Sequence, residues 1–220
     1  MQTLFDEHAG LALSRQRDLV TRLGTAAWNF DMGAGTMTFS TPAGAVVTRC
    51  QILGTESASS QTWLWGWANS QSGIPPALLA AGEALRAHGA RAGIAELTTR
   101  SVPLASWDGH ALAMIASGMT ACAGYYRGPY DGGALYVLLT GPELVTPVTQ
   151  PLVRLATIMP ELIAQHRVVD HRRALRGLAA GLGLTCAGDD AIVVSGRGEG
   201  RLECRFDDHG RLVAQSGLLA

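Results

Sequence analysis

The sequence of 220 residues contains no lysine, and all 17 of its basic residues are arginine. A GC-rich genome is the simplest explanation, since alanine, glycine and leucine are also abundant, and thermostability does not follow from it. Charge of either sign is scarce, at 16% of residues against 47% hydrophobic residues, and the net charge is −1. This composition predicts a sizeable core and argues against a protein that binds nucleic acid by neutralising its phosphates.

Cysteine is also scarce, and the four residues of this type, Cys50, Cys122, Cys186 and Cys204, include no CxxC pair. Their spacing argues against zinc and thioredoxin-like motifs, and the sequence contains no recognised catalytic or phosphate-binding motif. We therefore predict no catalytic residue, no metal site and no cofactor. Scattered thiols are typical of reduced intracellular proteins. With no signal-peptide pattern and no long uncharged apolar run, we expect a cytoplasmic protein without a membrane segment.

The most distinctive segment that is present is residues 62–69 (TWLWGWAN), which holds three of the five tryptophans. Successive side chains alternate between the faces of a strand, so Trp63, Trp65 and Trp67 would share one face. The residues between them are small or apolar, which predicts a strand buried on both faces, or buried on one and used for binding on the other. The tryptophan face is either core or an aromatic platform for a ligand or peptide, and the usual burial of tryptophan favours the core.

The remaining patterns predict an α+β fold in which an antiparallel sheet of about six strands packs against helices. The element order is α-ββββ-αα-ββ-α, followed by a small C-terminal α-βββ module. The main elements are a helix (3–23), four strands (27–31, 36–40, 45–56 and 62–69), two helices (75–88 and 108–119), a hairpin (124–130 and 134–139) and a helix from Pro151. The C-terminal module consists of a helix (171–182) and strands near 191–195, 200–206 and 211–215. We therefore predict two domains, residues 1–166 and 167–220.

Several strings resemble a known family when they are taken together. They are residues 53–57, residues 62–69, residues 93–98, Gly109-His110 and residues 125–130 (YYRGPY). In this order they resemble an uncharacterised bacterial family, a domain of unknown function, over roughly residues 28–139, and TWLWGWAN and YYRGPY are the most specific strings. The resemblance implies no established activity, so it assigns no functional residue. The order of elements is similar to the secretion-chaperone-like fold of bacterial export chaperones, a likeness of topology from which function does not follow.

The tyrosine-rich segment at the end of a predicted strand supplies the main candidate site, with Tyr125, Tyr126, Arg127 and Tyr130. Arg127 and the neighbouring phenols could hold a carboxylate or phosphate, since guanidinium and hydroxyl groups bind such anions with directed hydrogen bonds. Alternatively, Arg127 pairs with Glu56 or Asp131 and braces the turn. The sequence leaves both arrangements open.

Three further side chains, Glu56, Asp108 and His110, could form an acid–base set if the fold brings them together. The patterns favour a simpler alternative, in which Asp108 is the N-cap of a helix, His110 lies in its first turn and Glu56 ends a strand. The basic run at residues 167–176 is interpreted as a solvated helix face rather than a site for an acidic partner.

These observations favour a non-catalytic protein-binding module of chaperone-like, adaptor-like or toxin-neutralising type. The expected partner is another protein or a second copy of the chain, because antiparallel edge strands can accept a further strand. The alternative is a small-ligand-binding protein or an enzyme whose pocket combines residues 125–130 with Glu56 and His110. Nucleic acid and membranes are not expected partners.

Overall fold

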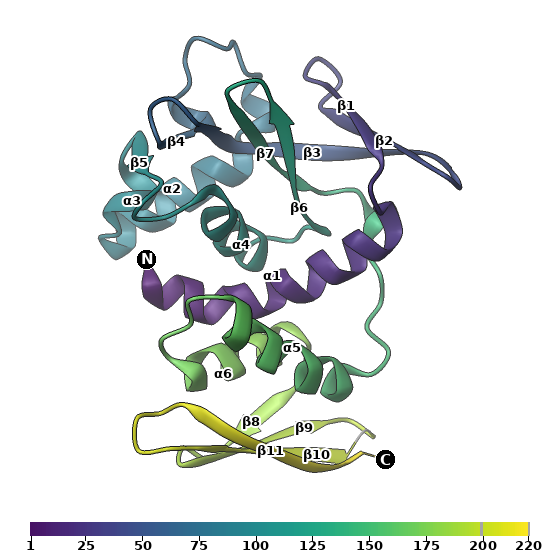
Figure 1. The fold of residues 1–220 in the computed structure, drawn as a ribbon, viewed down its shortest axis with the longest axis vertical. Helices are drawn as coiled ribbons and strands as arrows, with labels where there is room; N and C mark the ends of the chain where they lie inside the picture. The colour runs from purple at the N-terminus through teal and green to yellow at the C-terminus, as the bar shows by residue number, and fades with distance from the viewer. Residues whose placement is uncertain (199, 220) are drawn as a thin grey trace. The chain divides into compact units, whose positions relative to one another are not determined.

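The computed structural model describes residues 1–198 and 200–219, and it confirms the predicted α+β fold (Figure 1). The α-helices are α1 (Gln2–Leu23), α2 (Ala80–Ala92), α3 (Ala95–Thr98), α4 (Gly109–Met119), α5 (Pro151–Gln165) and α6 (His171–Gly181). The strands are β1 (Ala27–Asp31), β2 (Thr36–Thr41), β3 (Gly44–Ser57), β4 (Thr62–Trp65), β5 (Ser101–Pro103), β6 (Gly124–Tyr130), β7 (Gly133–Leu139), β8 (Thr185–Ala187), β9 (Ala191–Gly196), β10 (Gly200–Phe206) and β11 (Leu212–Leu219). Short 3₁₀ helices lie at Gly66–Ala68 (η1), Pro76–Leu78 (η2) and Pro142–Leu144 (η3).

The chain divides into two compact units. The smaller unit combines Met1–Ser14 with the chain from Pro147 onward, and the larger unit is Arg15–Thr146. Helix α1 therefore contributes its first residues to the smaller unit and its last turns to the larger one. The sequence predicts that residues 1–166 and residues 167–220 are separate domains, and this division stays a prediction.

Among the described residues of the larger unit, seven strands form one antiparallel sheet, against about six predicted. A strand that the sequence did not predict is β5, a three-residue segment that pairs with β4. The sheet is organised around the 14-residue strand β3. Its first half pairs with β2, and its second half pairs with β4 on one side and β7 on the other, while β6 pairs with β7. Strand β3 therefore joins the β1–β2 hairpin to the β6–β7 hairpin (Figure 1).

The tryptophan segment differs from its prediction in one respect. Strand β4 ends at Trp65, and the turn η1 that follows takes Trp67 away from the face shared by Trp63 and Trp65. The physical reason is the loss of a pairing partner. The β3–β4 ladder ends at the pair of Gly54 and Trp65, beside an irregularity in β3 between Ile52 and Gly54. Beyond that point residue 67 has no ladder to hold it in a strand.

The other two tryptophans of this segment, Trp63 and Trp65, are buried in the core of the larger unit. Their ring centroids lie 5.4 Å apart at an interplanar angle of 82°. The indole N–H of Trp65 donates to the carbonyl of Glu96 at 2.9 Å, whereas that of Trp63 has no partner within the described chain. Trp63 also packs edge-on against Tyr136, with centroids 5.2 Å apart. Core burial was the alternative that the sequence favoured for these two rings.

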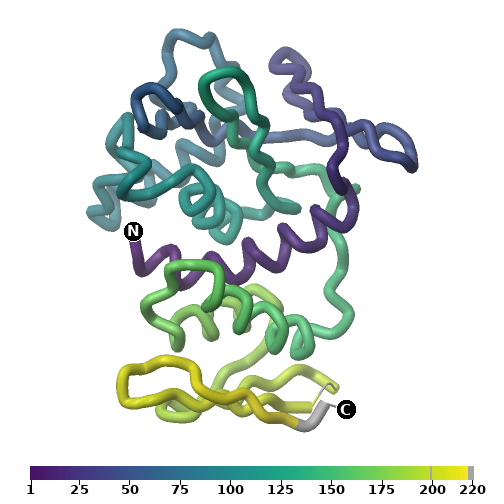
Figure 2. The backbone as a smooth tube through the Cα atoms, in the orientation of Figure 1, coloured from purple at the N-terminus to yellow at the C-terminus, as the bar shows by residue number. Residues whose placement is uncertain are grey.

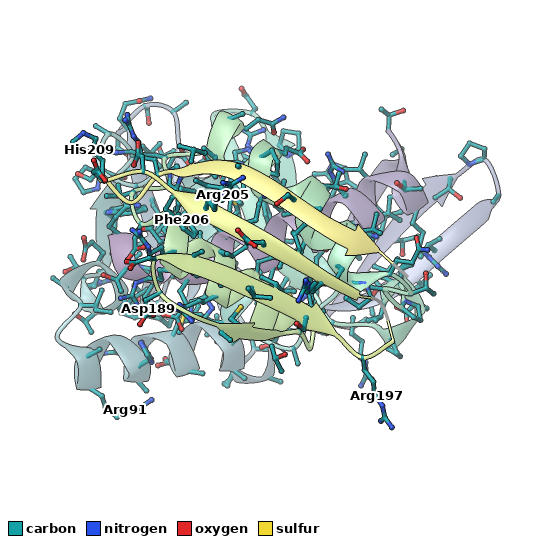
Figure 3. The ribbon with its side chains drawn as sticks, turned by 90° about the horizontal axis from the view of Figure 1, so that it is seen from below. Arg91, Asp189, Arg197, Arg205, Phe206 and His209 are labelled. Atoms are coloured by element: carbon teal, nitrogen blue, oxygen red, sulfur yellow. The ribbon has the colours of Figure 1, made fainter. Side chains whose placement is uncertain are left out.

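In the smaller unit, the described strands form a four-stranded antiparallel sheet in the order β11-β10-β9-β8. It contains one strand, β8, that the sequence did not predict. One face of this sheet packs on α5. Buried side chains of this core include Leu152, Leu155, Ile158, Leu162, Ile192, Val194, Leu202 and Cys204. Figure 3 views the sheet from its other face, where Arg205 of β10 is labelled, and the trace in Figure 2 shows the turn that joins β10 to β11.

Helix α6 starts at a well-defined cap that also fixes the beginning of β11. Asp170 accepts a hydrogen bond from the backbone N–H of Arg173 at 2.9 Å, and the N–H of Asp170 itself donates to Asp6 at 3.1 Å. The buried His171 follows, and its Nδ1 accepts a hydrogen bond from the backbone N–H of Leu212 at 3.0 Å. Burial lowers the pKa of His171, which keeps Nδ1 available as an acceptor near neutral pH.

Gly54 is a position where the packing of β3 leaves no room for a side chain. A Cβ atom there would lie 2.4 Å from the carbonyl oxygen of Leu64 and 2.6 Å from the Trp63 ring. We expect Gly54→Ala to lower the free energy of unfolding by about 1–3 kcal/mol, as overpacking of a core does, in urea titrations followed by tryptophan fluorescence. Gly33→Ala is the matched control, because a Cβ atom at Gly33 meets only an oxygen of Asp31, at 3.4 Å. Equal stability of the two variants would contradict this account of the core.

Candidate functional site

A group of polar side chains meets on one face of the larger unit's sheet, and its centre is set by strand register. Arg127 of β6 lies directly opposite Tyr136 of β7. Glu56 of β3 is diagonal to Tyr136, because the residue opposite Tyr136 is Gly54. Opposite and diagonal residues of an antiparallel pair share a face and lie within side-chain reach. These three residues, with His110 and Tyr125, are called the polar cluster below.

Glu56 is the acceptor at the centre of the polar cluster. Arg127 donates to its Oε1 from Nε at 2.9 Å and from Nη2 at 2.5 Å. The hydroxyl of Tyr136 donates to Oε2 at 2.9 Å and accepts from Arg127 Nε at 3.2 Å. The Glu56 side chain is 16% exposed and that of Arg127 is 37% exposed. Of the two arrangements that the sequence left open for Arg127, the structure shows the pair with Glu56.

His110 and Tyr125 extend the polar cluster from α4 and β6. Nδ1 of His110 lies 3.0 Å from the Tyr125 hydroxyl, and the His110 ring packs edge-on against Tyr136 at a centroid distance of 5.5 Å. Asp108 is the N-cap of α4, as the sequence favoured, since its side chain accepts from the N–H of Ala111 at 2.8 Å. The cap places His110 in the first turn of the helix, beside the two tyrosines.

Burial sets the protonation of the aromatic members of the polar cluster. Burial, assisted by the charge of Asp108, raises the pKa of Tyr125 to about 12. Burial and the hydrogen bond to Glu56 also raise the pKa of Tyr136. Partial burial lowers the pKa of His110, and the charge of Asp108 opposes this effect. Near neutral pH the cluster thus contains two protonated phenols and an uncharged imidazole, and each of these groups can donate and accept a hydrogen bond.

The tyrosine-rich segment is split between the two faces of β6. Tyr125 and Arg127 face the polar cluster, while Tyr126 between them faces the other way. Tyr126 packs edge-on against Phe39 and Trp28, with ring centroids 4.8 Å and 6.0 Å away. The predicted set of site residues therefore does not act from a single surface.

The other predicted site residues lie around these two groups. Tyr130 is the last residue of β6 and is 49% exposed. Trp63 lies directly opposite Glu56 in the β3–β4 ladder and packs edge-on against the ring of Tyr136. Trp67 is partly buried beneath the guanidinium group of Arg86, which lies 4.3 Å from its ring centroid.

Tyr136 is a central residue that the sequence analysis missed. The signal was present in the Asp131-Gly132 dipeptide, because this pair favours a two-residue hairpin turn, and such a turn pairs Arg127 with Tyr136. The predicted turn at residues 131–133 is one residue longer and would have placed Val137 opposite Arg127.

A second surface, which the sequence analysis also missed, is a groove of about 360 Å³ between α5 and β11 in the smaller unit. It is lined by Pro160, Ile163, Ala164, Leu212, Val213, Ala214 and Gln215, and it is called the β11 groove below. Strand β11 forms an edge of its sheet, and its eight residues include no charged residue and no proline. Natural proteins commonly protect edge strands with such residues. Val213 on this edge is 62% exposed.

The arginines of α6 line a wider cleft of about 640 Å³ in the smaller unit. Each is already paired with a neighbouring oxygen. Arg172 donates to the carbonyl of Asp189, Arg176 to the carboxylate of Asp189, and Arg173 to Glu7. This pairing agrees with the interpretation of the basic run as a solvated helix face.

Within the described residues, no group of three His, Cys, Asp or Glu side chains could hold a metal ion. In the same part of the chain, every helix is too short or too polar to cross a bilayer. Cys50 and Cys204 are buried, and burial raises the pKa of each thiol to about 11. Thiols with such pKa values are poor nucleophiles near neutral pH.

Removing the charge of Glu56 tests the polar cluster as a structural brace. We expect Glu56→Gln to lower the free energy of unfolding by about 1–3 kcal/mol, because Arg127 and Tyr136 lose charged acceptors in a partly buried place. Glu83→Gln is the matched control, since Glu83 pairs with Arg86 at 3.5 Å where both side chains are half exposed. We expect its effect to stay within about 0.5 kcal/mol. Urea titration measures both, and equal effects would contradict the bracing role.

Comparison with known proteins identifies a family. The sequence profile of a family of unknown function, DUF6882, matches residues 2–142. No curated protein and no solved structure matches the chain. The matched residues extend from α1 to η3 and include the whole polar cluster, whereas α5, α6 and the four-stranded sheet lie beyond them. Since the match covers more than half of the chain, the protein belongs to DUF6882, a family of unknown function.

Proposed function

We propose that this protein is a non-catalytic protein-binding module that receives an extended strand of its partner at the β11 groove. The observation that carries the proposal is the open, uncharged edge of β11 beside an apolar groove. Such an edge presents unpaired N–H and C=O groups to another strand. In strand addition, the backbone supplies affinity and pockets for alternate side chains supply specificity. The groove offers a pocket of this kind.

The bonding within the polar cluster supports a non-catalytic protein. Glu56 and Arg127 satisfy each other, and the Tyr125 hydroxyl is paired with His110. Catalysis by an activated nucleophile requires a group with a lowered pKa or an adjacent base that takes its proton. Burial raises the pKa of both tyrosines and lowers that of His110, so the imidazole beside Tyr125 is a weak base next to a tightly held proton. The cluster links side chains of β3, β6, β7 and α4, as expected of a group that holds these elements together.

A role as a chaperone, adaptor or toxin-neutralising protein in the bacterial cytoplasm fits this surface. Such proteins hold another chain and carry out no chemistry on it. The net charge of −1 supports a protein partner over nucleic acid.

A charge at the edge of β11 tests strand addition. We expect the wild-type protein to select extended apolar peptides from a displayed library, and Val213→Lys to weaken their binding by about tenfold or more, because lysine on an edge strand blocks pairing. Val47→Lys is the matched control, since Val47 is a strand valine of similar exposure in the larger unit, 56% against 62% for Val213. Fluorescence titration measures affinity.

Hydrogen exchange locates the bound peptide independently. The backbone amides of β11 should exchange more slowly in the complex, because they become paired with the added strand. Equal binding by Val213→Lys, together with protection at another element, would rule out the β11 groove as the binding surface.

A second candidate function is small-ligand binding or catalysis at the polar cluster. The observation that favours it is the convergence of Glu56, His110 and Arg127, with Arg127 partly exposed at the cluster's edge. A thermal-shift screen of anionic metabolites tests it. A ligand that stabilises the wild-type protein and fails to stabilise Arg127→Gln, with Arg86→Gln as control, would support this candidate. A screen without such a ligand would leave the cluster as a brace.

A further inference from the structure

We infer that the strand received at the β11 groove is β11 of a second copy of this chain. The two strands would pair antiparallel about a two-fold axis that passes between the two copies of Gln215. The inference rests on the proposed function, because it requires the edge of β11 to accept a strand, and it adds the identity of that strand. Three observations carry it, namely the placement of Gln215, the composition of β11 and the shape of the groove.

Gln215 occupies an unusual position for a polar side chain. Strand pairing places Gln215 opposite Cys204 of β10, and Cys204 is buried. Residues opposite each other in an antiparallel pair point to the same face, so Gln215 lies on the inner face of the sheet. Its Nε2 atom is buried and has no hydrogen-bond partner among the described residues. An unpaired buried donor is unfavourable. Because Gln215 lines the groove on an edge strand, a rotation of its side chain toward that edge would let the amide reach an acceptor outside the chain.

A second copy of the chain supplies that acceptor by symmetry. A primary amide carries both a donor and an acceptor. When two identical strands pair antiparallel about an axis at residue 215, the two Gln215 side chains lie directly opposite each other on one face, with Cβ atoms about 4.5–5.5 Å apart. Each Nε2 can then donate to the Oε1 of the other copy. One isologous contact thus satisfies both buried donors.

The composition of β11 permits this pairing. An axis at residue 215 places Ala214 opposite Ser216, so small residues face each other on both sides of the axis. Val213 is the extra residue of a bulge, since Arg205 pairs with Ala214 and Phe206 with Leu212, and it would lie near Gly217 of the other copy, which has no side chain. The described strand contains no charged residue. Self-pairing therefore places no like charges opposite each other, an arrangement that would destabilise the sheet.

The surroundings of β11 also suit a second strand. The groove wall on α5 consists of Pro160, Ile163 and Ala164, which would face the inner side chains of the added strand. The opposite edge of the same sheet, β8, has only three residues and offers a much shorter template. Pairing two copies through β11 would give one continuous eight-stranded sheet.

A glutamate at position 215 tests the two-fold axis. In sedimentation equilibrium of the full chain, we expect the wild-type protein to dimerise. At neutral pH, Gln215→Glu should raise the dimer dissociation constant on the order of a hundredfold, because two carboxylates would face each other across the axis. Lowering the pH through the ordinary pKa of glutamate, about 4.3, should restore the dimer, since protonated carboxyl groups again offer a donor and an acceptor.

Two further variants keep the test decisive. Gln71→Glu makes the same chemical change at an exposed position of the larger unit, and its dimer should be unaffected at either pH. Val213→Lys should weaken the dimer at neutral pH, where far-ultraviolet circular dichroism checks that each variant is folded. A dimer that persists in both Gln215→Glu and Val213→Lys would overturn the inference, because the contact would then lie elsewhere.

The outcomes separate this inference from the proposed function. A wild-type protein that stays monomeric at every concentration overturns self-pairing. If that monomer still binds extended peptides and loses them in Val213→Lys, strand addition stands and the partner is a different protein. If the monomer binds no peptide, both the inference and the proposed function fail.

Discussion

The register between β3 and β7 is the constraint on which the larger unit depends. Between Ile52 and Gly54 the pairing shifts by one residue, so the alternation of side chains along β3 changes phase before Glu56 is reached. A slip of one residue moves every side chain of a strand to the opposite face. Without this irregularity, Glu56 would leave the face that carries Tyr136 and Arg127. The same irregularity ends the ladder to β4 and so sends Trp67 out of the tryptophan face.

The polar cluster shows why that register is so strongly specified. A partly buried carboxylate and guanidinium are each unfavourable alone, and they become acceptable only when all their bonding groups find partners. Glu56 accepts three hydrogen bonds from Arg127 and Tyr136, so an alternative register would leave charges without partners. Because the penalty for breaking the network is larger than the net gain from making it, the cluster selects one arrangement of the sheet.

Local chemistry made much of this structure predictable, and long-range packing limited the rest. Asp108 was identifiable as a cap because capping depends on residues three positions apart, and Glu56 was one of two partners proposed for Arg127 from sequence. Tyr136 required counting across a hairpin, which was within reach. The β11 groove could not be predicted, because Ile163 and Val213 lie on elements whose packing no local sequence pattern describes. Trp67 was misplaced since period-two alternation holds only while a strand has a pairing partner.

The polar cluster and the β11 groove lie in different parts of the chain. The polar cluster lies within the residues that match the family, whereas the β11 groove lies beyond them, so the bracing of one unit does not determine what the other binds. An uncharged edge strand pairs with any extended chain unless something restricts its register. A buried polar pair supplies such a restriction at some expense of stability, as single buried asparagines do in coiled coils. Gln215 would act in this way, because a strand displaced by two residues would leave both amide donors buried and unpaired again.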